Sequence, residues 1–318
     1  MTNTKQVFCC GSVAYDLVIV SKTTGREFNI KACPGGSVFN TAAALARYGV
    51  NVSLIANLAE DFLGDEFVGI LLEEGISPRF VSRDSRIKTG LAIARINKKG
   101  ESSYVFYRSS GPETAIPYNT SLLSSFKKGD VFHTGSAFTY ADHSHESVLK
   151  IMRSASDRGV FVTYDPNWRE GRVKNKSVAK ARIKKFLDLA NLIRLNETDA
   201  MEITGQKTLT SALKKLPERA ILTMGKKGSF YWNGKKSAKC PAPQVKVVDT
   251  IGAGDAFTAG IIYRYCIMGE DGFWRNMRKN LEFASHTAAL VCSEHGAIAG
   301  LKRSLIAEPD KAMPPMKK

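Results

Sequence analysis

The sequence has no apolar run long enough to cross a membrane and no recognisable secretion signal. The apolar segment from Val7 to Val20 contains Gly11, Ser12 and Asp16, which make it too polar, as well as too short, for a transmembrane helix. The segment also lacks the arrangement of a signal peptide. We therefore expect no membrane partner and a cytoplasmic location.

Cysteine is scarce, and the 6 cysteines show no CxxC pair and no disulfide-framework spacing. Most of them lie in apolar runs, which favours reduced thiols in the core. The 5 histidines show no metal-ligand spacing except that of His143 and His145. This pair precedes an amphipathic helix, and we interpret it as a surface loop rather than a zinc site.

Negative charge is scarce relative to positive charge, with 30 Asp and Glu against 46 Lys and Arg. The net charge of +16 fits nucleic acid, an acidic membrane surface or phosphate-bearing substrates. The densest basic segments, Arg172 to Lys185 and Lys302 to Lys318, do not interleave aromatic side chains as nucleic-acid surfaces often do. We interpret them as a solvated helix face and a frayed tail, and we expect no nucleic-acid partner.

Strand-like and helix-like runs alternate along the chain, which is typical of β-α-β units. Val52 to Asn57 precedes Gly64 to Glu74, and Phe161 to Asp165 precedes Ser177 to Leu189. Because the strand-like runs are short and apolar on both faces, we expect parallel strands covered by helices on both sides. The predicted fold is α/β, with a doubly wound, mostly parallel, Rossmann-like sheet.

Two segments interrupt this alternation. Residues 16–32 are extended without a crossover helix, and Thr89 to Arg108 predict a hairpin of two strands around a turn that ends at Gly100. Such segments predict a small β-sheet that acts as a lid over the carboxyl ends of the parallel strands. The expected division is a core of residues 1–15, 33–86 and 110–318 and a lid of residues 16–32 and 87–109.

The most informative motif is DTIGAGDAF, from Asp249 to Phe257. It follows the strand-like Val245 to Val248, so it predicts a strand, a glycine loop and a helix start. Gly252 and Gly254 let the backbone turn sharply, and the N–H groups and dipole of the helix start attract an anion. Asp255, in the first helical turn, suits proton abstraction. A capped helix start without catalytic function is the alternative that these residues leave open.

A second glycine motif, PGGSVFNTAAALA, runs from Pro34 to Ala46 and predicts an extended segment followed by a helix. Ser37 is a candidate N-cap, and Asn40 follows in the first turn. Asn is a poor helix former, so a polar ligand near Gly35 and Gly36 would explain its presence. A surface Asn without function is the alternative.

Together the two motifs resemble the signatures of the ribokinase-like sugar kinases, the PfkB family. The Gly-Gly-x-x-x-Asn helix start and the Asp-Thr-x-Gly-Ala-Gly-Asp-x-Phe loop occur in the order and separation of that family, and the resemblance extends from Gly11 to Gly296. It implies a Rossmann-like core, a β-lid, a sugar bound between them, and ATP with Mg²⁺ on the C-terminal half.

The resemblance also implies residue roles. Asp255 would be the base, and Gly252, Ala253 and Gly254 would form the anion hole for the transferred phosphoryl group. The implied sugar contacts are Asp16, Gly35, Gly36 and Asn40. The implied nucleotide contacts, from looser matches, are Asn196, Thr223, Gly225, Gly228, Ser285 and Ala288.

The implied metal contacts rest on two segments. Asp199 stands where the family's Asn-x-x-Glu element has Glu, and this shorter carboxylate favours a water-mediated contact with Mg²⁺. In relatives that bind a monovalent cation such as K⁺, the backbone around Asp249 and Ile251 supplies ligands, and the sequence leaves such a site open.

Two segments bear on the substrate. Tyr104 to Arg108 and Tyr164 to Arg169 resemble the fructokinase and 2-keto-3-deoxygluconate kinase branches, with Arg108, Asp165 and Arg169 as sugar contacts. A guanidinium pairs with carboxylates and also donates to hydroxyls, so two arginines suit a sugar acid or a ketose. We expect fructose, with 2-keto-3-deoxygluconate or another sugar or nucleoside acceptor as the alternative.

Other classes fit less well. A dinucleotide-dependent oxidoreductase would have Gly-x-Gly-x-x-Gly after the first strand, where Gly11 is followed by Ser12-Val13-Ala14. A non-catalytic, sugar-binding regulatory relative would not need Asp255 and the glycines of the anion hole, which are intact. A homodimer through the lid strands and an unpaired lid both stay open.

Overall fold

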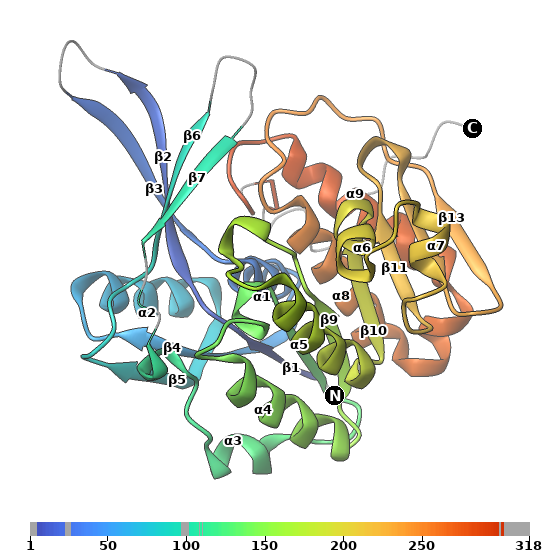
Figure 1. Cartoon of the computed structure of the whole chain (residues 1–318), viewed down its shortest axis with the longest axis horizontal. Coiled ribbons are helices and arrows are strands. Elements are labelled where there is room, and N and C mark those ends of the chain that lie inside the picture. The colour runs from blue at the N-terminus through green and yellow to red at the C-terminus, as the bar shows by residue number, and fades with distance from the viewer. Residues whose placement is uncertain are drawn as a thin grey trace.

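The computed structural model has two separate β-sheets, a large one in the core and a small one that projects away from it at the upper left of Figure 1. The structure describes residues 5–22, 27–96, 102–107, 109, 111–298 and 300–301. Within these residues, the strand order of the large sheet is β13-β12-β11-β10-β9-β8-β1-β4-β5. Its strands are β1 (Gln6–Cys10), β4 (Asn51–Ala59), β5 (Ile76–Asp84), β8 (Val131–Gly135), β9 (Phe161–Asp165), β10 (Leu192–Asn196), β11 (Ala220–Thr223), β12 (Ser229–Trp232) and β13 (Ser237–Cys240).

The large sheet is doubly wound. All neighbouring strands from β11 to β5 pair in parallel, and only β12 and β13 add antiparallel strands at one end. The chain moves from β1 to β4 and β5 in one direction and later from β8 to β11 in the other, so the order reverses between β1 and β8. Ligands of such sheets bind at the carboxyl ends of the strands beside this reversal. The predicted fold class is confirmed.

Helices cover both faces of the large sheet. Alternate residues of β1 serve the two faces: Val7 and Cys9 join one hydrophobic cluster, and Phe8 and Cys10 join the other. No helix in the described ranges combines the length and apolar character needed to cross a bilayer. The helices are α1 (Ser37–Arg47), α2 (Phe62–Glu74), α3 (Thr120–Ser125), α4 (His145–Asp157), α5 (Lys176–Leu189), α6 (Glu197–Thr204), α7 (Leu209–Leu213), α8 (Ala253–Arg275) and α9 (Met277–Cys292).

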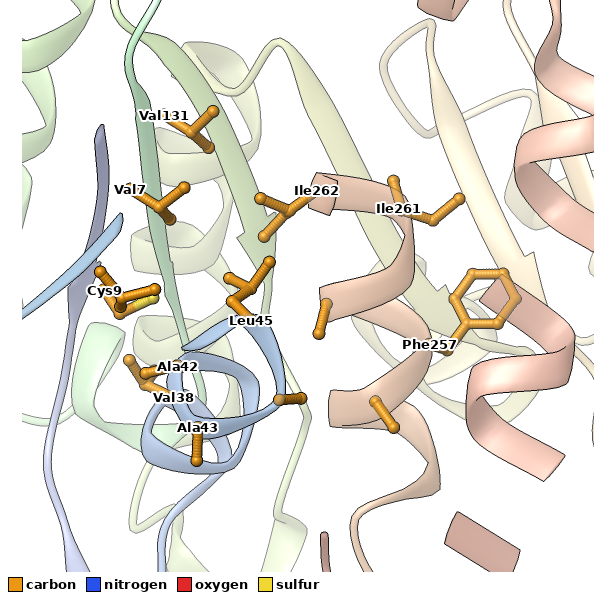
Figure 2. Close-up of a cluster of buried hydrophobic side chains, with 14 of the residues drawn as sticks. Val7, Cys9, Val38, Ala42, Ala43, Leu45, Val131, Phe257, Ile261 and Ile262 are labelled. Atoms are coloured by element: carbon orange, nitrogen blue, oxygen red, sulfur yellow. The ribbon is translucent and has the colours of Figure 1, made fainter. Parts of the chain in front are cut away.

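Helices α1 and α8 pack closely on the face that Val7 and Cys9 occupy. Figure 2 shows side chains of α1, such as Leu45, and of α8, such as Ile262, over this part of the sheet. Small buried residues let the two helices approach each other and bring their N-terminal turns together. These small residues are Ala42, Ala43 and Ala44 of α1 and Ala256 and Ala259 of α8.

The small sheet has the strand order β3-β2-β6-β7, with β2 (Ala14–Lys22), β3 (Phe28–Gly35), β6 (Leu91–Ile96) and β7 (Ser102–Tyr107). The strands β6 and β7 pair antiparallel, as the predicted hairpin requires, and its turn lies outside the described residues. The strands β2 and β3 extend beyond the expected segment 16–32 at both junctions with the core. Ile30, Val105, Phe106 and Tyr107 are exposed on this sheet.

The strand predicted at Val245–Val248 is wrong. Residues 241–248 have no regular secondary structure, and the side chains of Val245, Val247 and Val248 are exposed. The Val248 N–H donates instead to the Cys292 carbonyl (2.8 Å) at the end of α9. A β-favouring run becomes a strand only where a neighbouring strand pairs with it, and here none does.

Candidate active site

The carboxylate of Asp255 lies where the first turns of α1 and α8 meet. Ser37 Oγ donates to Asp255 Oδ1 (2.6 Å), and Asn40 Nδ2 donates to Asp255 Oδ2 (2.8 Å). Thr41 Oγ1 donates to the Asp255 carbonyl (3.3 Å). Asp255 is buried, with 9% of the residue exposed. The two glycine motifs of the sequence are thus joined through one carboxylate.

Burial raises the pKa of Asp255 to about 6. The hydrogen bonds from Ser37 and Asn40 oppose burial and lower the pKa, while the charge of Asp165 raises it and that of Arg194 lowers it. A carboxyl with a pKa near 6 is mostly ionised at pH 7 and accepts a proton more readily than an ordinary aspartate. This balance suits a general base at neutral pH.

Two glycines of the loop before α8 are required by space. Gly252 has φ of 77°, a conformation that favours glycine, and a Cβ there would collide with the Ala297 carbonyl. A Cβ on Gly254 would lie 2.8 Å from Arg194 Nη1, so a guanidinium packs directly against this residue. The N-cap of α8 is Gly252, and among the described residues no side-chain hydrogen bond caps this helix start. The Ala253 N–H makes a long bond to the Thr250 carbonyl (3.3 Å), and the N–H groups of this turn can face an anion.

Arg194 is a site residue that the sequence prediction missed. Its Nη1 donates to Asp165 Oδ2 (2.9 Å), and its Nη2 donates to Thr223 Oγ1 (2.5 Å). Arg194 Nε is buried and has no partner among the described residues. A charged residue inside the apolar strand β10 was the available signal, because a buried arginine needs a partner.

The residues expected to bind the sugar fall into two groups. Asp16 lies against Gly35, because a Cβ added to Gly35 would meet the Asp16 carboxylate. Gly36 turns the chain into α1 with φ of 111°. Asn40 Oδ1 is buried without a partner among the described residues, so it can accept a hydrogen bond from a hydroxyl. Thus Gly35, Gly36 and Asn40 lie together at the start of α1, with Asp16 beside them.

In the second group, Asp165 is close enough to Asp255 for its charge to raise the pKa of that carboxyl. Asp165 is buried, and its carboxylate pairs with Arg194. Arg169 is exposed, and its backbone N–H donates to Tyr140 Oη (3.0 Å). Arg108 lies outside the described residues.

The residues expected to bind the nucleotide line the carboxyl ends of β10 and β11 and one side of α9. Asn196 caps α6, and Thr223 ends β11 beside Arg194. Gly225 and Gly228 both have positive φ, and a Cβ on Gly228 would collide with the Cys240 carbonyl. Ser285 Oγ is 3.4 Å from Ser229 Oγ, and Ala288, also on α9, is half-buried.

The residues predicted to bind metal can contact an ion through water or through backbone groups. Asp199 is 5% exposed and accepts the Trp168 N–H (3.1 Å), and burial followed by the charge of Asp165 raises its pKa to about 6. The Asp249 carboxylate accepts the N–H groups of Ile251 (2.9 Å) and Gly296 (3.2 Å), so it braces the loop. The described part of the chain holds no group of three or more His, Cys, Asp or Glu that suits a metal. Mg²⁺ would therefore depend on nucleotide phosphates and bridging water.

The fold and sequence are similar to those of known sugar kinases. The chain is 28% identical over 314 residues to a probable fructokinase-5 of Arabidopsis thaliana, covering 95% of both chains. A Vibrio cholerae fructokinase structure with fructose, ADP and potassium ion aligns with a TM-score of 0.82 at 22% identity, over 96% of this chain and 97% of that one.

An aminoimidazole riboside kinase from Salmonella enterica, bound to its riboside and an ATP analog, aligns with a TM-score of 0.80 at 20% identity, over 96% of this chain and 99% of that one. The model of the pfkB family carbohydrate kinases matches residues 4–303, nearly the whole chain. The resemblance seen in the two glycine motifs is confirmed, and the chain belongs to the pfkB family of carbohydrate kinases.

Proposed function

We propose that this kinase transfers the γ-phosphoryl group of ATP to a hydroxyl of fructose, with Asp255 as the base. The buried Asp255 carboxylate, held between two α1 donors and next to an uncapped helix start, is the observation that carries this proposal. The full-length similarity to a plant protein named as a probable fructokinase supports fructose, and the Vibrio cholerae structure holds both fructose and ADP.

In this proposal, the sugar hydroxyl gives its proton to Asp255 as its oxygen attacks the γ-phosphorus. The bond between that phosphorus and the bridging oxygen breaks, and ADP leaves with the electron pair. The N–H groups at Gly252, Ala253 and Gly254 stabilise the charge on the transferred group. Asp199 would hold Mg²⁺ through water, and the ion would supply further positive charge at the phosphates.

Asn40, Gly35, Gly36 and Asp16 hold the sugar in this proposal. Asn40 uses its amide group to orient Asp255 and its unpartnered Oδ1 to accept from a sugar hydroxyl. One side chain therefore contacts both the base and the acceptor. Such positioning accounts for most of the catalysis in phosphoryl transfer.

On the nucleotide side, we assign the phosphates to Asn196, Thr223, Gly225 and Gly228 and the adenine to the α9 surface at Ser285 and Ala288. A monovalent cation at the backbone of Asp249 and Ile251 is part of the same proposal. Replacing K⁺ with a large organic cation at constant ionic strength should then lower turnover. Unchanged turnover would contradict the cation site.

We also propose that the small sheet closes over the sugar as a lid, with 16–32 and 87–109 as its segments, and that it pairs with the lid of a second copy. Exposed apolar side chains on β3 and β7 support a partner there. A cytoplasmic location, where ATP is available, completes the proposal; the buried thiols of Cys9 and Cys10 are compatible with it.

A substrate panel tests the acceptor. Purified protein with ATP and Mg²⁺ is given fructose, 2-keto-3-deoxygluconate, ribose or adenosine, and ADP formation is measured. Fructose should give the largest kcat/KM. A larger kcat/KM for 2-keto-3-deoxygluconate would make this sugar acid the preferred substrate instead, and Arg169 would then be a candidate to bind its carboxylate. No turnover with any acceptor would contradict fructose as the substrate.

A further inference from the structure

Ser37 makes the shortest hydrogen bond to the Asp255 carboxylate, yet neither the sequence motifs nor the family match assigns it a role in catalysis. Its hydroxyl donates to Oδ1 at 2.6 Å, while Asn40 donates to Oδ2 at 2.8 Å. Ser37 and Asn40 are three residues apart in the first turn of α1, so both side chains lie on one face of the helix. The helix start thus holds the two carboxylate oxygens separately.

This two-point attachment fixes the plane of the carboxylate. An ionised carboxylate has about four lone-pair positions on its two oxygens. Ser37 and Asn40 occupy one position on each oxygen, which leaves the others for an incoming hydroxyl. Rotation of the Asp255 side chain would break one bond or both, so the orientation of the remaining positions is set before the sugar arrives.

We propose that Ser37 is a positioning residue for catalysis: its hydroxyl holds the Asp255 carboxylate in the orientation that accepts the sugar proton and stabilises its negative charge. This inference rests on the proposed role of Asp255 as the base. The chemistry needs no group beyond those already named, because Ser37 donates the same hydrogen bond before and after the acceptor binds.

The surroundings of Asp255 make this neutral donor important. The charged groups that act on the carboxylate are Asp165 from β9, which repels it, and Arg194 from β10, which attracts it. Arg194 is itself paired with Asp165, so the two effects oppose each other. From α1 the carboxylate receives only the neutral donors Ser37 and Asn40. The Ser37 bond also lowers the pKa of Asp255, against burial.

Ser37→Ala isolates this bond better than a change at Asn40, which also faces the proposed sugar site. The measurement is kcat/KM for fructose at saturating ATP from pH 5.5 to pH 8.5, as the ratio of variant to wild type at each pH. Because ATP itself titrates in this range, only the ratio reports the protein. Loss of a hydrogen bond to the charged form should move the acidic limb of the profile up by about one pH unit.

The expected ratio is close to its maximum at pH 8 and about fivefold lower at pH 6, if the half-point moves from about 6 to about 7. Ser37→Thr keeps a hydroxyl and should restore the wild-type profile. Thr41→Val is the matched control, because it removes a hydroxyl of the same helix that bonds the Asp255 backbone rather than its carboxylate. Its profile should not move. Thermal unfolding of each variant checks that the fold is retained.

A ratio for Ser37→Ala that is the same at every pH would overturn the inference, whether that ratio is near one or low. A shift that Thr41→Val reproduces, or that Ser37→Thr does not correct, would also overturn it. Failure of the proposed function looks different: Asp255→Asn would then keep wild-type turnover, whereas failure of the Ser37 inference alone leaves Asp255→Asn inactive.

Discussion

The start of α8 and the small sheet are built in opposite ways. At the start of α8, Asp255 accepts from two side chains of α1, and Arg194 packs against the loop glycine. On the small sheet, Val105, Phe106 and Tyr107 are exposed, and β3 and β7 form its edges. The first region is held together by buried polar groups that bond to one another. The second keeps surface that only a ligand or another chain can cover.

The largest expected effect on stability comes from Arg194. In Arg194→Met, the buried Asp165 carboxylate loses its ion-pair partner, which should lower the free energy of unfolding by about 3–5 kcal/mol in urea denaturation. Adding Asp165→Asn removes the uncompensated charge and should recover part of the loss. Arg278→Met, at an exposed pair with Glu282, is the matched control and should change stability by less than about 1 kcal/mol. Equal losses of stability in Arg194→Met and Arg278→Met would contradict the expected difference between the buried and the exposed ion pair.

A second effect concerns pH. The pKa of Asp199 is raised from 3.8 to about 6, so the folded state retains a proton that the unfolded chain loses. Stability should therefore fall as the pH rises from about 4 to about 6, by about 3 kcal/mol for this group. Asp199→Asn should remove that part of the fall in urea denaturation without Mg²⁺. Asp157→Asn, at an exposed carboxylate, should leave the fall unchanged.

The glycine loop before α8 allows a sharper test of the buried site at the start of this helix. Gly252→Ala adds both positive-φ strain and a clash with the Ala297 carbonyl, so turnover should drop at least about tenfold and stability by about 1–3 kcal/mol. Gly49→Ala has a similar φ of 73° but meets no atom within 4 Å. It should lower stability slightly and leave turnover unchanged. A comparable loss of turnover in both would show that backbone strain alone is responsible.

The smallest expected effect is on the small sheet. Val105→Ser exchanges an exposed side chain, so the free energy of unfolding of the monomer should change by less than about 0.5 kcal/mol. If the sheet pairs with a second copy, the same change should raise the dimer dissociation constant in sedimentation experiments. A large loss of monomer stability would place Val105 in the core instead.

Local patterns predicted much of this molecule. The starts of α1 and α8 are recognisable from their glycines and the few residues that follow. Asn40 and Asp255, which form a hydrogen bond in the structure, belong to these two motifs. The alternation of apolar runs likewise predicted the parallel sheet. Both kinds of signal depend on residues close together in the sequence.

Contacts between distant segments could not be predicted in the same way. Arg194 meets Asp165 and Thr223, each 29 residues away, only because β9, β10 and β11 are neighbours in the sheet. Val245–Val248 has strand-forming residues but no neighbouring strand, so propensity was misleading there. The prediction of Ser37 as an N-cap is wrong, because Gly36 is the N-cap of α1 and no side chain of the described residues caps it there. The bond from Ser37 to Asp255 joins two helices that are distant in the sequence.

The most direct test of the account is whether Asp255 is the base or only a residue at a helix start. Turnover of Asp255→Asn with fructose and ATP is compared with wild type, and fructose binding is measured by calorimetry. We predict a fall in kcat of about 10² to 10⁴ with fructose binding retained. Turnover within about fivefold of wild type, in a protein that binds fructose normally, would contradict the central claim, because general-base catalysis is worth more than that.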